Sequence, residues 1–496
     1  MNTEVLRLRI DRCPPPTAAY MALCDNGRRP GTALLESAAR GHGGTRRSLI
    51  AVAPALRIAL HGDRVTLTAA SANGRTALAR LADAGVPSEI PVPQRAGKVT
   101  DESARLREPS VLDPLRQVLA ALAPARTTDR DALLLVGALA FELADRFDAL
   151  PPLPAGPTPD FVFTVPELVL DIDHLSGRAE LRAIAFDTPG RRDLARALEK
   201  IAEALEQVDT NAPAPPDAPA QVAAEECDDA AFALKVKRAQ AAVVAGTVYQ
   251  LVVSRSWTMP CTDPFAAYRR LRAQNPSPYL FYLCDESGTL FGASPESALR
   301  FDAVSRTADL YPVAGTRARG SDDDGDARVE AELRHDPKEL AEHMMLVDLA
   351  RNDIARICEP GTRTVPVLLG VDRYRHVMHL VSRVQGRLRA DLDAFHALRA
   401  CLNMGTLSGA PKLSASALIR ELEGVRRGFY GGAVGVLDAA GNLDTAITIR
   451  AAFVRDGEAR VQAGAGIVLD SHPQREADET RAKAQAVLDA LGGAPA

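Results

Sequence analysis

The chain has 496 residues, of which 46% are hydrophobic and 25% are charged, and its formal net charge is −5. These values are those of a globular protein and exclude disorder, collagen and coiled coil as descriptions of the whole chain. The slightly acidic balance argues against a protein that binds nucleic acid or an anionic membrane over a broad surface.

Cysteine usage and hydropathy indicate where the protein works. The seven cysteines form no CxxC motif, which favours reduced thiols over a disulfide framework or a zinc site. The first residues lack the apolar core of a signal peptide, and no apolar run reaches the length of a membrane span. We therefore expect a cytoplasmic protein without membrane contact.

The predicted elements begin with a β-hairpin in the N-terminal part. Residues 56–69 alternate apolar and polar side chains on both sides of a His-Gly-Asp turn. Farther along, residues 209–227 are rich in proline and alanine and almost free of bulky apolar side chains. This composition is typical of a linker and predicts an N-terminal domain over 1–208 and a second domain over 228–493.

The C-terminal part contains further hairpin patterns and two strong helical patterns. Residues 431–449 and 444–469 each hold two β-prone runs around a glycine-containing turn. Residues 337–357 and 474–491 have helical patterns, and these helices must cover the sheets. Antiparallel sheets covered by helices predict an α+β fold rather than a Rossmann arrangement.

Two pairs of glutamates lie at helical spacing in these two segments. Glu339 and Glu342 are three residues apart, and Glu476 and Glu479 repeat the spacing, with Lys483 one turn beyond. Taken alone, the first pair also fits a helix-capping box, and Glu479 with Lys483 fits an ion pair on a solvated helix face. If the pairs face each other, their carboxylates suit a hard cation such as Mg²⁺, which polarises a substrate carboxylate.

Small residues gather in three further segments. The Gln-Ala-Gly-Ala-Gly run that ends at Gly466 offers backbone N–H groups to a carboxylate, although alone it is more typical of a β-bulge. Residues 404–412 combine small and hydroxyl side chains, and residues 291–296 place Glu296 directly after a tight turn. His379 lies in an apolar, strand-like run, where an isolated histidine is most often a core residue.

Together these segments resemble the chorismate-utilising enzymes, and within that family the large, chorismate-binding subunits of anthranilate synthase. The resemblance covers essentially the whole chain and is densest between residues 247 and 491. The segments that carry it include GTVYQLVVSRSW, LFGASPES, DPKELAEHMMLVDLARNDIARIC, NMGTLSGAPK, GFYGGAVGV, VQAGAGIVLDS and EADETRAKA.

The resemblance implies a Mg²⁺ site and a cradle for the two carboxylates of chorismate. Glu342 and Glu479 would bind the cation directly, and Glu339 and Glu476 would act through water. The residues that match the carboxylate-binding positions of the family are Tyr430, Arg450, Gly464, Ala465, Gly466 and Lys483.

The resemblance also assigns chemical roles to three residues. Glu296 would be the general acid that protonates the departing C4 hydroxyl while ammonia adds at C2. His379 matches the histidine associated with the second stage, in which the C2 proton and pyruvate are lost. Thr406 would contact the ring or the departing side chain.

Two positions separate the branches of this family. Gln250 stands where water-using members carry a lysine base, and Ala314 stands where aminodeoxychorismate synthases carry a nucleophilic lysine. Both indicate 2-amination, and hence conversion of chorismate and ammonia to anthranilate and pyruvate. A 2-amino-2-deoxyisochorismate synthase, which omits pyruvate loss, remains the alternative. An inactive sensing subunit is disfavoured because the metal-type and catalytic residues occur together.

A feedback site is implied in the N-terminal half of the chain. The Leu-Leu-Glu-Ser motif and the Pro-Ser-Pro-Tyr segment resemble the tryptophan pocket of feedback-inhibited members. Leu280 stands where the nearest pattern has methionine, a nearly volume-conserving exchange. The residues that would line the pocket are Leu35, Glu36, Ser37, Pro278, Tyr279 and Leu280.

The chain carries no nucleophile motif of a glutaminase, so ammonia must come from elsewhere. The resemblance implies a separate glutamine amidotransferase subunit as the partner, assembled with this chain in a heterotetramer. It also implies the first step of tryptophan biosynthesis as the role of the enzyme.

Overall fold

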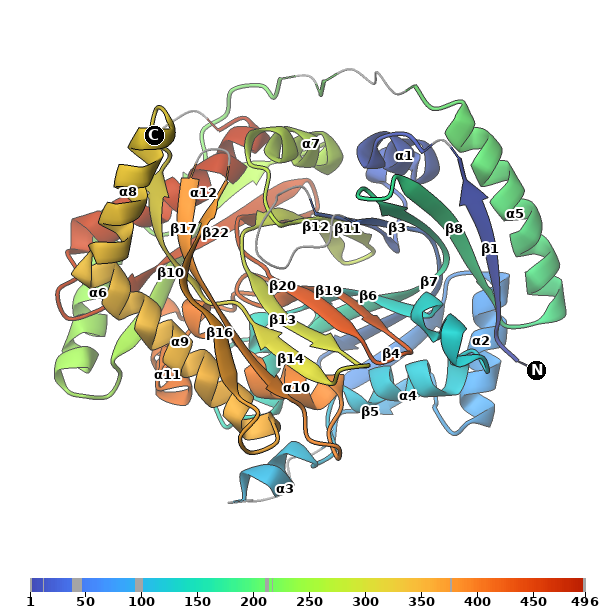
Figure 1. Ribbon diagram of the computed structural model, residues 1–496, viewed down its shortest axis with the longest axis horizontal. Helices are drawn as coiled ribbons and strands as arrows, with labels where there is room; N and C mark the ends of the chain where they lie inside the picture. The colour runs from blue at the N-terminus through green and yellow to red at the C-terminus, as the bar shows by residue number, and fades with distance from the viewer. Residues whose placement is uncertain are drawn as a thin grey trace.

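The computed structural model describes residues 2–11, 13–37, 47–93, 101–209, 214–215, 217–374 and 377–493. Within these residues, 22 strands are joined by hydrogen bonding into one antiparallel β-network, and helices cover its outer faces (Figure 1). The α+β class expected from the hairpin and helix patterns is confirmed. The predicted linker, residues 209–227, lies partly outside the described residues.

Strands from the first two hundred residues form the side of the molecule that holds the N-terminus (Figure 1). β7 lies at the centre of this side and pairs with β3, β6 and β8. The strands are β1 (Glu4–Ile10), β2 (Thr32–Glu36), β3 (Arg47–His61), β4 (Arg64–Ala69), β5 (Glu89–Pro91), β6 (Leu134–Leu139), β7 (Phe161–Asp173) and β8 (Arg178–Ala185).

The remaining strands form the side that carries the acidic helices. β10 and β22 pair along most of their length, and β17 pairs with β14, β15 and β16. The strands are β9 (Ala224–Glu225), β10 (Gln250–Pro260), β11 (Tyr279–Asp285), β12 (Gly288–Ser294), β13 (Ser297–Asp302), β14 (Thr307–Leu310), β15 (Val313–Ala318), β16 (Thr364–Arg373), β17 (Val377–Arg387), β18 (Gly409–Ala410), β19 (Ala433–Asp438), β20 (Leu443–Ile447), β21 (Ala451–Arg455) and β22 (Glu458–Ile467).

The three predicted hairpins are confirmed as β3–β4, β19–β20 and β21–β22. In the last of them, Asp456 and Gly457 have φ of 52° and 80°, the left-handed conformation at both central positions of a primed turn. Glycine adopts this conformation at no steric cost, which explains why the Asp-Gly pair marks the turn in the sequence.

Two strand pairings run across the predicted domain boundary. β2 pairs with β11, with Leu280 opposite Glu36, and β6 pairs with β19, with Leu139 opposite Ala433. The N-terminal residues are therefore part of the same sheet network as the C-terminal residues.

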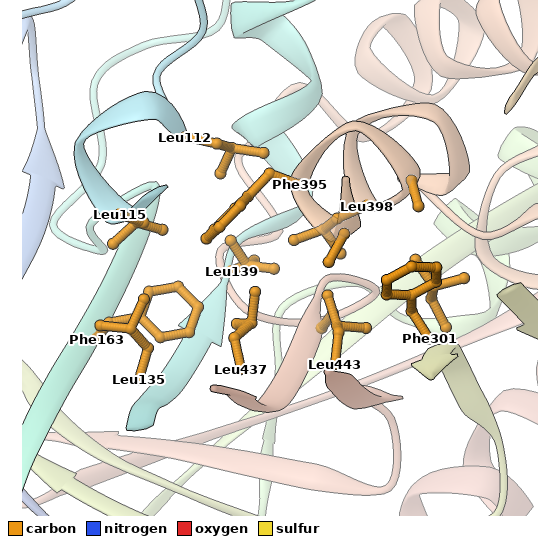
Figure 2. Packing of buried hydrophobic residues seen from close by; sticks show 14 of the residues in the cluster. Leu112, Leu115, Leu135, Leu139, Phe163, Phe301, Phe395, Leu398, Leu437 and Leu443 are labelled. Atoms are coloured by element: carbon orange, nitrogen blue, oxygen red, sulfur yellow. The ribbon is translucent and has the colours of Figure 1, made fainter. Parts of the chain in front are cut away.

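A shared hydrophobic core lies against the β6–β19 pairing (Figure 2). Leu139 of β6 and Phe163 of β7 pack with Leu437 of β19, with Leu115 of α4 and with Leu398 of α10. None of these five side chains is more than 1% exposed. Each contributes about 1.5–3 kcal/mol through the hydrophobic effect, so the core holds both halves of the chain in one arrangement.

Helices cover the outside of the network and place the acidic segments. α9 packs against β15 and β17, and α12 packs against β22 and α6. The helices are α1 (Pro16–Leu23), α2 (Ala72–Asp83), α3 (Glu102–Leu106), α4 (Asp113–Leu122), α5 (Thr188–Glu206), α6 (Asp229–Val244), α7 (Pro264–Gln274), α8 (Asp323–His335), α9 (Pro337–Ile357), α10 (Ala394–Cys401), α11 (Lys412–Glu423) and α12 (Pro473–Leu491). In the described ranges, no helix combines the length and the apolar character needed to cross a membrane.

Candidate active site

The first pair of predicted metal ligands lies on the first two turns of α9. Asp336 caps this helix by accepting hydrogen bonds from the backbone N–H groups of Lys338 and Glu339. The Glu339 carboxylate accepts a hydrogen bond from Arg317 of β15 at 2.8 Å, and the same guanidinium donates to the capping Asp336 at 2.7 Å. Arg317 thus links Glu339 and the capping residue of α9 to β15.

The pKa of Glu342 shows that the carboxylates of α9 and α12 interact electrostatically. Burial raises the pKa of Glu342 to about 7, and Glu339, Glu479 and Glu476 contribute to the rise while Lys338 opposes it. Burial also raises the pKa of Glu476. Carboxylates on the two helices therefore lie near enough to repel one another.

The four carboxylates have the chemistry of a site for a hard divalent cation. Among the described residues, no three His, Cys, Asp or Glu side chains form a ready-made metal-binding group. Ammonium groups compensate part of the charge, because Lys338 lies 3.8 Å from Glu342 and Lys483 lies 2.5 Å from Glu479. A cation with oxygen ligands and its own waters relieves the repulsion among such carboxylates, so these residues fit Mg²⁺.

The predicted carboxylate cradle lies beside the second acidic pair. The Lys483 ammonium donates to the Gly464 carbonyl at 3.0 Å, and the Arg450 guanidinium donates to the Lys483 carbonyl at 3.0 Å. The backbone of Gly464 is also a hydrogen-bond partner of the Tyr430 hydroxyl, a group whose pKa is raised to about 12 by burial. Arg450 has a φ of 50°, an uncommon backbone conformation for a residue with a side chain and one that recurs at functional sites.

Two glycines of strand β22, Gly464 and Gly466, allow other site residues to approach closely. A Cβ atom at Gly464 would lie 3.0 Å from the Tyr430 hydroxyl, and one at Gly466 would lie 2.6 Å from the Gln250 amide nitrogen. Ala465 points the other way, into the core, and is fully buried. The glycines therefore bring Tyr430 and Gln250 to one face of the strand.

Glu296 lies between β12 and β13 and is 6% exposed. Burial raises its pKa to about 8, whereas the Thr406 hydroxyl, the Val313 backbone and Lys483 act in the opposite direction. Glu296 and Thr406 line the same small cavity of about 30 Å³. The carboxyl group is therefore mostly protonated at neutral pH, the state that a proton donor needs.

His379 lies on β17 opposite β15. Its Nδ1 atom is 2.9 Å from the Thr316 hydroxyl, and burial together with Arg450 lowers its pKa to about 4. Ala314 pairs with the next residue of β17, Leu380, and the backbone of Gly315 passes beside the Glu339 carboxylate. The β15–β17 pair thus brings His379 and Ala314 close to the acidic helix α9. The imidazole of His379 is neutral at pH 7.

All six residues predicted for tryptophan line a second cavity of about 590 Å³. The β2–β11 pairing brings the two motifs together, because Leu35 and Glu36 lie opposite Phe281 and Leu280. Within the part of the chain that the structure describes, which omits residues 38–46, the buried Ser37 hydroxyl has no hydrogen-bond partner. Such a group can accept or donate a hydrogen bond to a ligand at little additional cost.

Glu36 has protein partners in this structure. Tyr268 donates to its carboxylate at 2.6 Å, and Arg272 donates to both oxygens at 2.8 and 2.9 Å. The carboxylate thus holds α7 against β2 and forms a charged end of the cavity. Leu280 is 1% exposed and packs in the core beside it.

Several residues around these sites were missed by the sequence interpretation. Arg317 and Thr316 contact Glu339 and His379, and both belong to the segment in which only Ala314 was singled out. Arg47 also lines the larger cavity. A sequence motif identifies one segment of the chain, whereas these contacts arise where strands from distant segments pair.

The whole arrangement falls within a known protein family. Residues 79–489 match the family model described as chorismate binding enzyme. The chain is 51% identical over 471 residues to the pyocyanine-specific anthranilate synthase component 1 of Pseudomonas aeruginosa, a match that covers 90% of this chain and 88% of that protein. It is 49% identical over 500 residues to anthranilate synthase component 1 of Salmonella typhimurium, covering 97% and 95% of the two chains.

A solved structure has the same architecture. Anthranilate synthase component I from Streptococcus pneumoniae superposes with a TM-score of 0.73 at 29% sequence identity, over 90% of this chain and 93% of that one. The four glutamates of the acidic helices, the carboxylate cradle and Glu296 all lie inside the range matched by the family model.

Proposed function

The chain belongs to the chorismate-binding enzyme family, and we propose that it converts chorismate and ammonia to anthranilate and pyruvate. The observation that carries the proposal is the burial of Glu296, which is 6% exposed and lines a cavity with Thr406, and this burial raises its pKa to about 8. Ammonia adds at C2 as the C4 hydroxyl leaves, and hydroxide is a poor leaving group. A carboxyl group that is protonated at neutral pH delivers the proton with which it leaves as water.

The residues that we propose to lie around the reacting carbon favour ammonia as the nucleophile. Gln250 cannot accept and pass on a proton as a lysine amine does, so it does not activate water. Ala314 carries no nucleophile of its own and leaves space for a small molecule. The names of the two bacterial relatives, both anthranilate synthase component 1, point to the same 2-amination.

We propose that Glu342 and Glu479 hold Mg²⁺ directly and that Glu339 and Glu476 act through water. When bound, the cation supplies a Lewis acid beside a substrate carboxylate. Tyr430, Arg450, Lys483 and the Gly464–Gly466 loop would hold and orient the carboxylates of chorismate. The planar fork of Arg450 suits bidentate contact, and Lys483 suits a point charge.

His379 is proposed to serve the second stage, in which the C2 proton is lost and the enolpyruvyl C–O bond breaks to release pyruvate. With a pKa of about 4, its imidazole is neutral at pH 7 and has a nitrogen lone pair available. The hydrogen bond between Nδ1 and the Thr316 hydroxyl orients the ring. Thr406, next to Glu296, would contact the substrate ring or the departing group.

We further propose feedback inhibition by tryptophan at the cavity lined by Ser37 and Tyr279. Its volume of about 590 Å³ is in the usual range for small-molecule sites. The name component 1 of the relatives implies a second component, for which we propose a glutamine amidotransferase that delivers ammonia. We propose that the two chains form a heterotetramer in the cytoplasm and catalyse the first step of tryptophan biosynthesis.

The test uses the purified chain with chorismate, Mg²⁺ and a high concentration of ammonium at mildly alkaline pH. Anthranilate is followed by fluorescence and pyruvate by a coupled assay. We expect both products in equal amounts, and we expect both to disappear when EDTA is added. Glutamine should replace ammonium only when the amidotransferase is present.

Other outcomes would change the proposal in defined ways. Chorismate consumption without pyruvate would identify 2-amino-2-deoxyisochorismate as the product and leave the amination chemistry intact. Tryptophan binding without any chorismate consumption would instead identify a sensing subunit.

A further inference from the structure

A buried ion pair lies behind the carboxylate cradle and has no part in the chemical steps proposed above. Arg427 donates from Nε and Nη2 to the two oxygens of Glu423, at 2.9 and 2.6 Å. The two side chains are 1% and 2% exposed. Desolvation of a buried ion pair can cost more free energy than the mutual attraction returns, so such a pair is weak evidence for a role in stability alone.

The other donors of Arg427 reach two segments that carry site residues. Nη1 donates to the Leu407 carbonyl at 2.7 Å, directly after Thr406. Nη2 donates to the Val252 carbonyl at 2.9 Å, two residues after Gln250. One planar guanidinium thus ties the loop that carries Thr406 to the strand that carries Gln250.

The same guanidinium contacts the ring of a residue in the carboxylate cradle. Its central carbon lies 5.7 Å from the centroid of the Tyr430 ring and 4.5 Å from that of Phe141, both within cation–π range. The backbone N–H groups of Arg427 and Gly428 donate to the buried Glu142 carboxylate at 2.7 and 3.1 Å. The backbone of the segment that leads to Tyr430 and the ring of Tyr430 are therefore both held in place.

Glu423 extends the network to the glycine loop. Its carboxylate accepts hydrogen bonds from the N–H and the hydroxyl of Ser254, each at 2.8 Å. The Ser254 hydroxyl in turn accepts a hydrogen bond from the Gln462 amide at 2.8 Å. Gln462 lies two residues before Gly464, and Ser254 is the direct strand partner of Gly464.

We propose that Arg427, paired with Glu423, is a positioning residue that sets Thr406 against Glu296 and the Tyr430 ring against Gly464. The proposal rests on the proposed function, which states what these residues are positioned for. Lysine cannot take this role, because a single ammonium on a flexible stem does not reproduce the planar fork that reaches both carbonyls and Glu423.

The test compares Arg427→Lys with the wild type, using the full chain with saturating ammonia and Mg²⁺. Because Thr406 and Tyr430 both lose their support, we expect kcat to fall about 10- to 100-fold and the KM for chorismate to rise. A variant that merely unfolds in part loses active enzyme but keeps the KM of the remainder. Glu423→Gln should act in the same direction and serves if Arg427→Lys gives too little folded protein.

The pH profile gives a readout that a purely structural role does not move. The Thr406 hydroxyl lowers the pKa of Glu296, so a displaced Thr406 lets that pKa rise. The alkaline limb of kcat should therefore move to higher pH in Arg427→Lys, as it should in Thr406→Val. The double variant should show no further movement than Thr406→Val alone.

Arg426→Lys is the matched control, since this neighbouring arginine pairs with Asp160 at 2.5 Å and makes none of the hydrogen bonds that Arg427 makes to Glu423, Leu407 and Val252. It should keep the kinetics of the wild type. Wild-type kcat, KM and alkaline limb in Arg427→Lys would overturn the positioning role. If the wild type forms no anthranilate, that result counts against the proposed function instead. The positioning role is then tested by the affinity for chorismate, measured by calorimetry. Binding should be weaker in Arg427→Lys than in Arg426→Lys.

Discussion

Replacing Glu296 by glutamine should remove both the proton donor and the alkaline limb of the rate profile. In the wild type, a pKa of about 8 leaves ~90% of the carboxyl groups protonated at pH 7 and ~10% at pH 9. Turnover should therefore fall about tenfold for each pH unit above 8. Glu296→Gln should lose roughly 10²- to 10⁴-fold in kcat at pH 7 and should show no such limb.

The same carboxyl group predicts a change in stability that does not depend on turnover. Its pKa in the folded chain, about 8, lies above the ordinary value of 4.5, so between these values the folded chain holds a proton that the unfolded chain has released. The free energy of unfolding therefore falls as pH rises through this window. At about 1.4 kcal/mol per pH unit, the wild type should lose about 3 kcal/mol relative to Glu296→Gln between pH 6 and pH 9.

The assay pairs anthranilate fluorescence at a constant concentration of NH₃ with urea unfolding at pH 6 and pH 9. Glu286→Gln is the control, because Glu286 lies in the turn of the same β11–β12 hairpin and its side chain is 71% exposed. This control should follow the wild type in both measurements. The reasoning is refuted if the wild type and Glu296→Gln lose stability in parallel, or if the alkaline limb of the wild type falls below pH 7.

Substitutions at three further positions test the metal site, the second cavity and the core. Glu479→Gln should nearly abolish turnover and weaken Mg²⁺ binding measured by calorimetry about tenfold or more, without lowering Tm; near-normal activity would contradict the metal assignment. Ser37→Phe should fill part of the larger cavity and relieve tryptophan inhibition in a dose–response assay while activity is retained; unchanged inhibition would remove the feedback site. Leu139→Ala should cost about 2–5 kcal/mol in urea unfolding and Leu139→Met less than about 1.5, and equal losses would contradict the close packing of the shared core.

Local signals in the sequence were sufficient for the elements that carry the acidic residues. An aspartate followed by proline predicted the start of α9, and the three-residue spacing of Glu339 and Glu342 placed both on one face. The Asp-Gly pair predicted the β21–β22 turn for a steric reason that operates within two residues. The fold class followed from these elements, because hairpins with covering helices leave few other arrangements.

Contacts between distant segments could not be predicted in this way. Arg427 bonds to carbonyl groups 20 and 175 residues away, and those groups occur in every residue of the chain. The sequence contains 59 lysines and arginines, and nothing in its local pattern distinguishes the few that are buried, Arg427 among them. The close approach of Gln250 to Gly466 could not be predicted either, because a small residue indicates that another group lies close but does not identify that group.

The pairing of β6 with β19 has a consequence for synthesis of the chain. Leu139 leaves the ribosome 294 residues before Ala433, its partner across the sheet. At roughly 5–20 residues per second, the growing chain waits about 15–60 s before the partner strand exists. During this interval one edge of β6 and the apolar side chains of the shared core have no C-terminal partner, so the nascent N-terminal half is exposed to aggregation until translation is nearly complete.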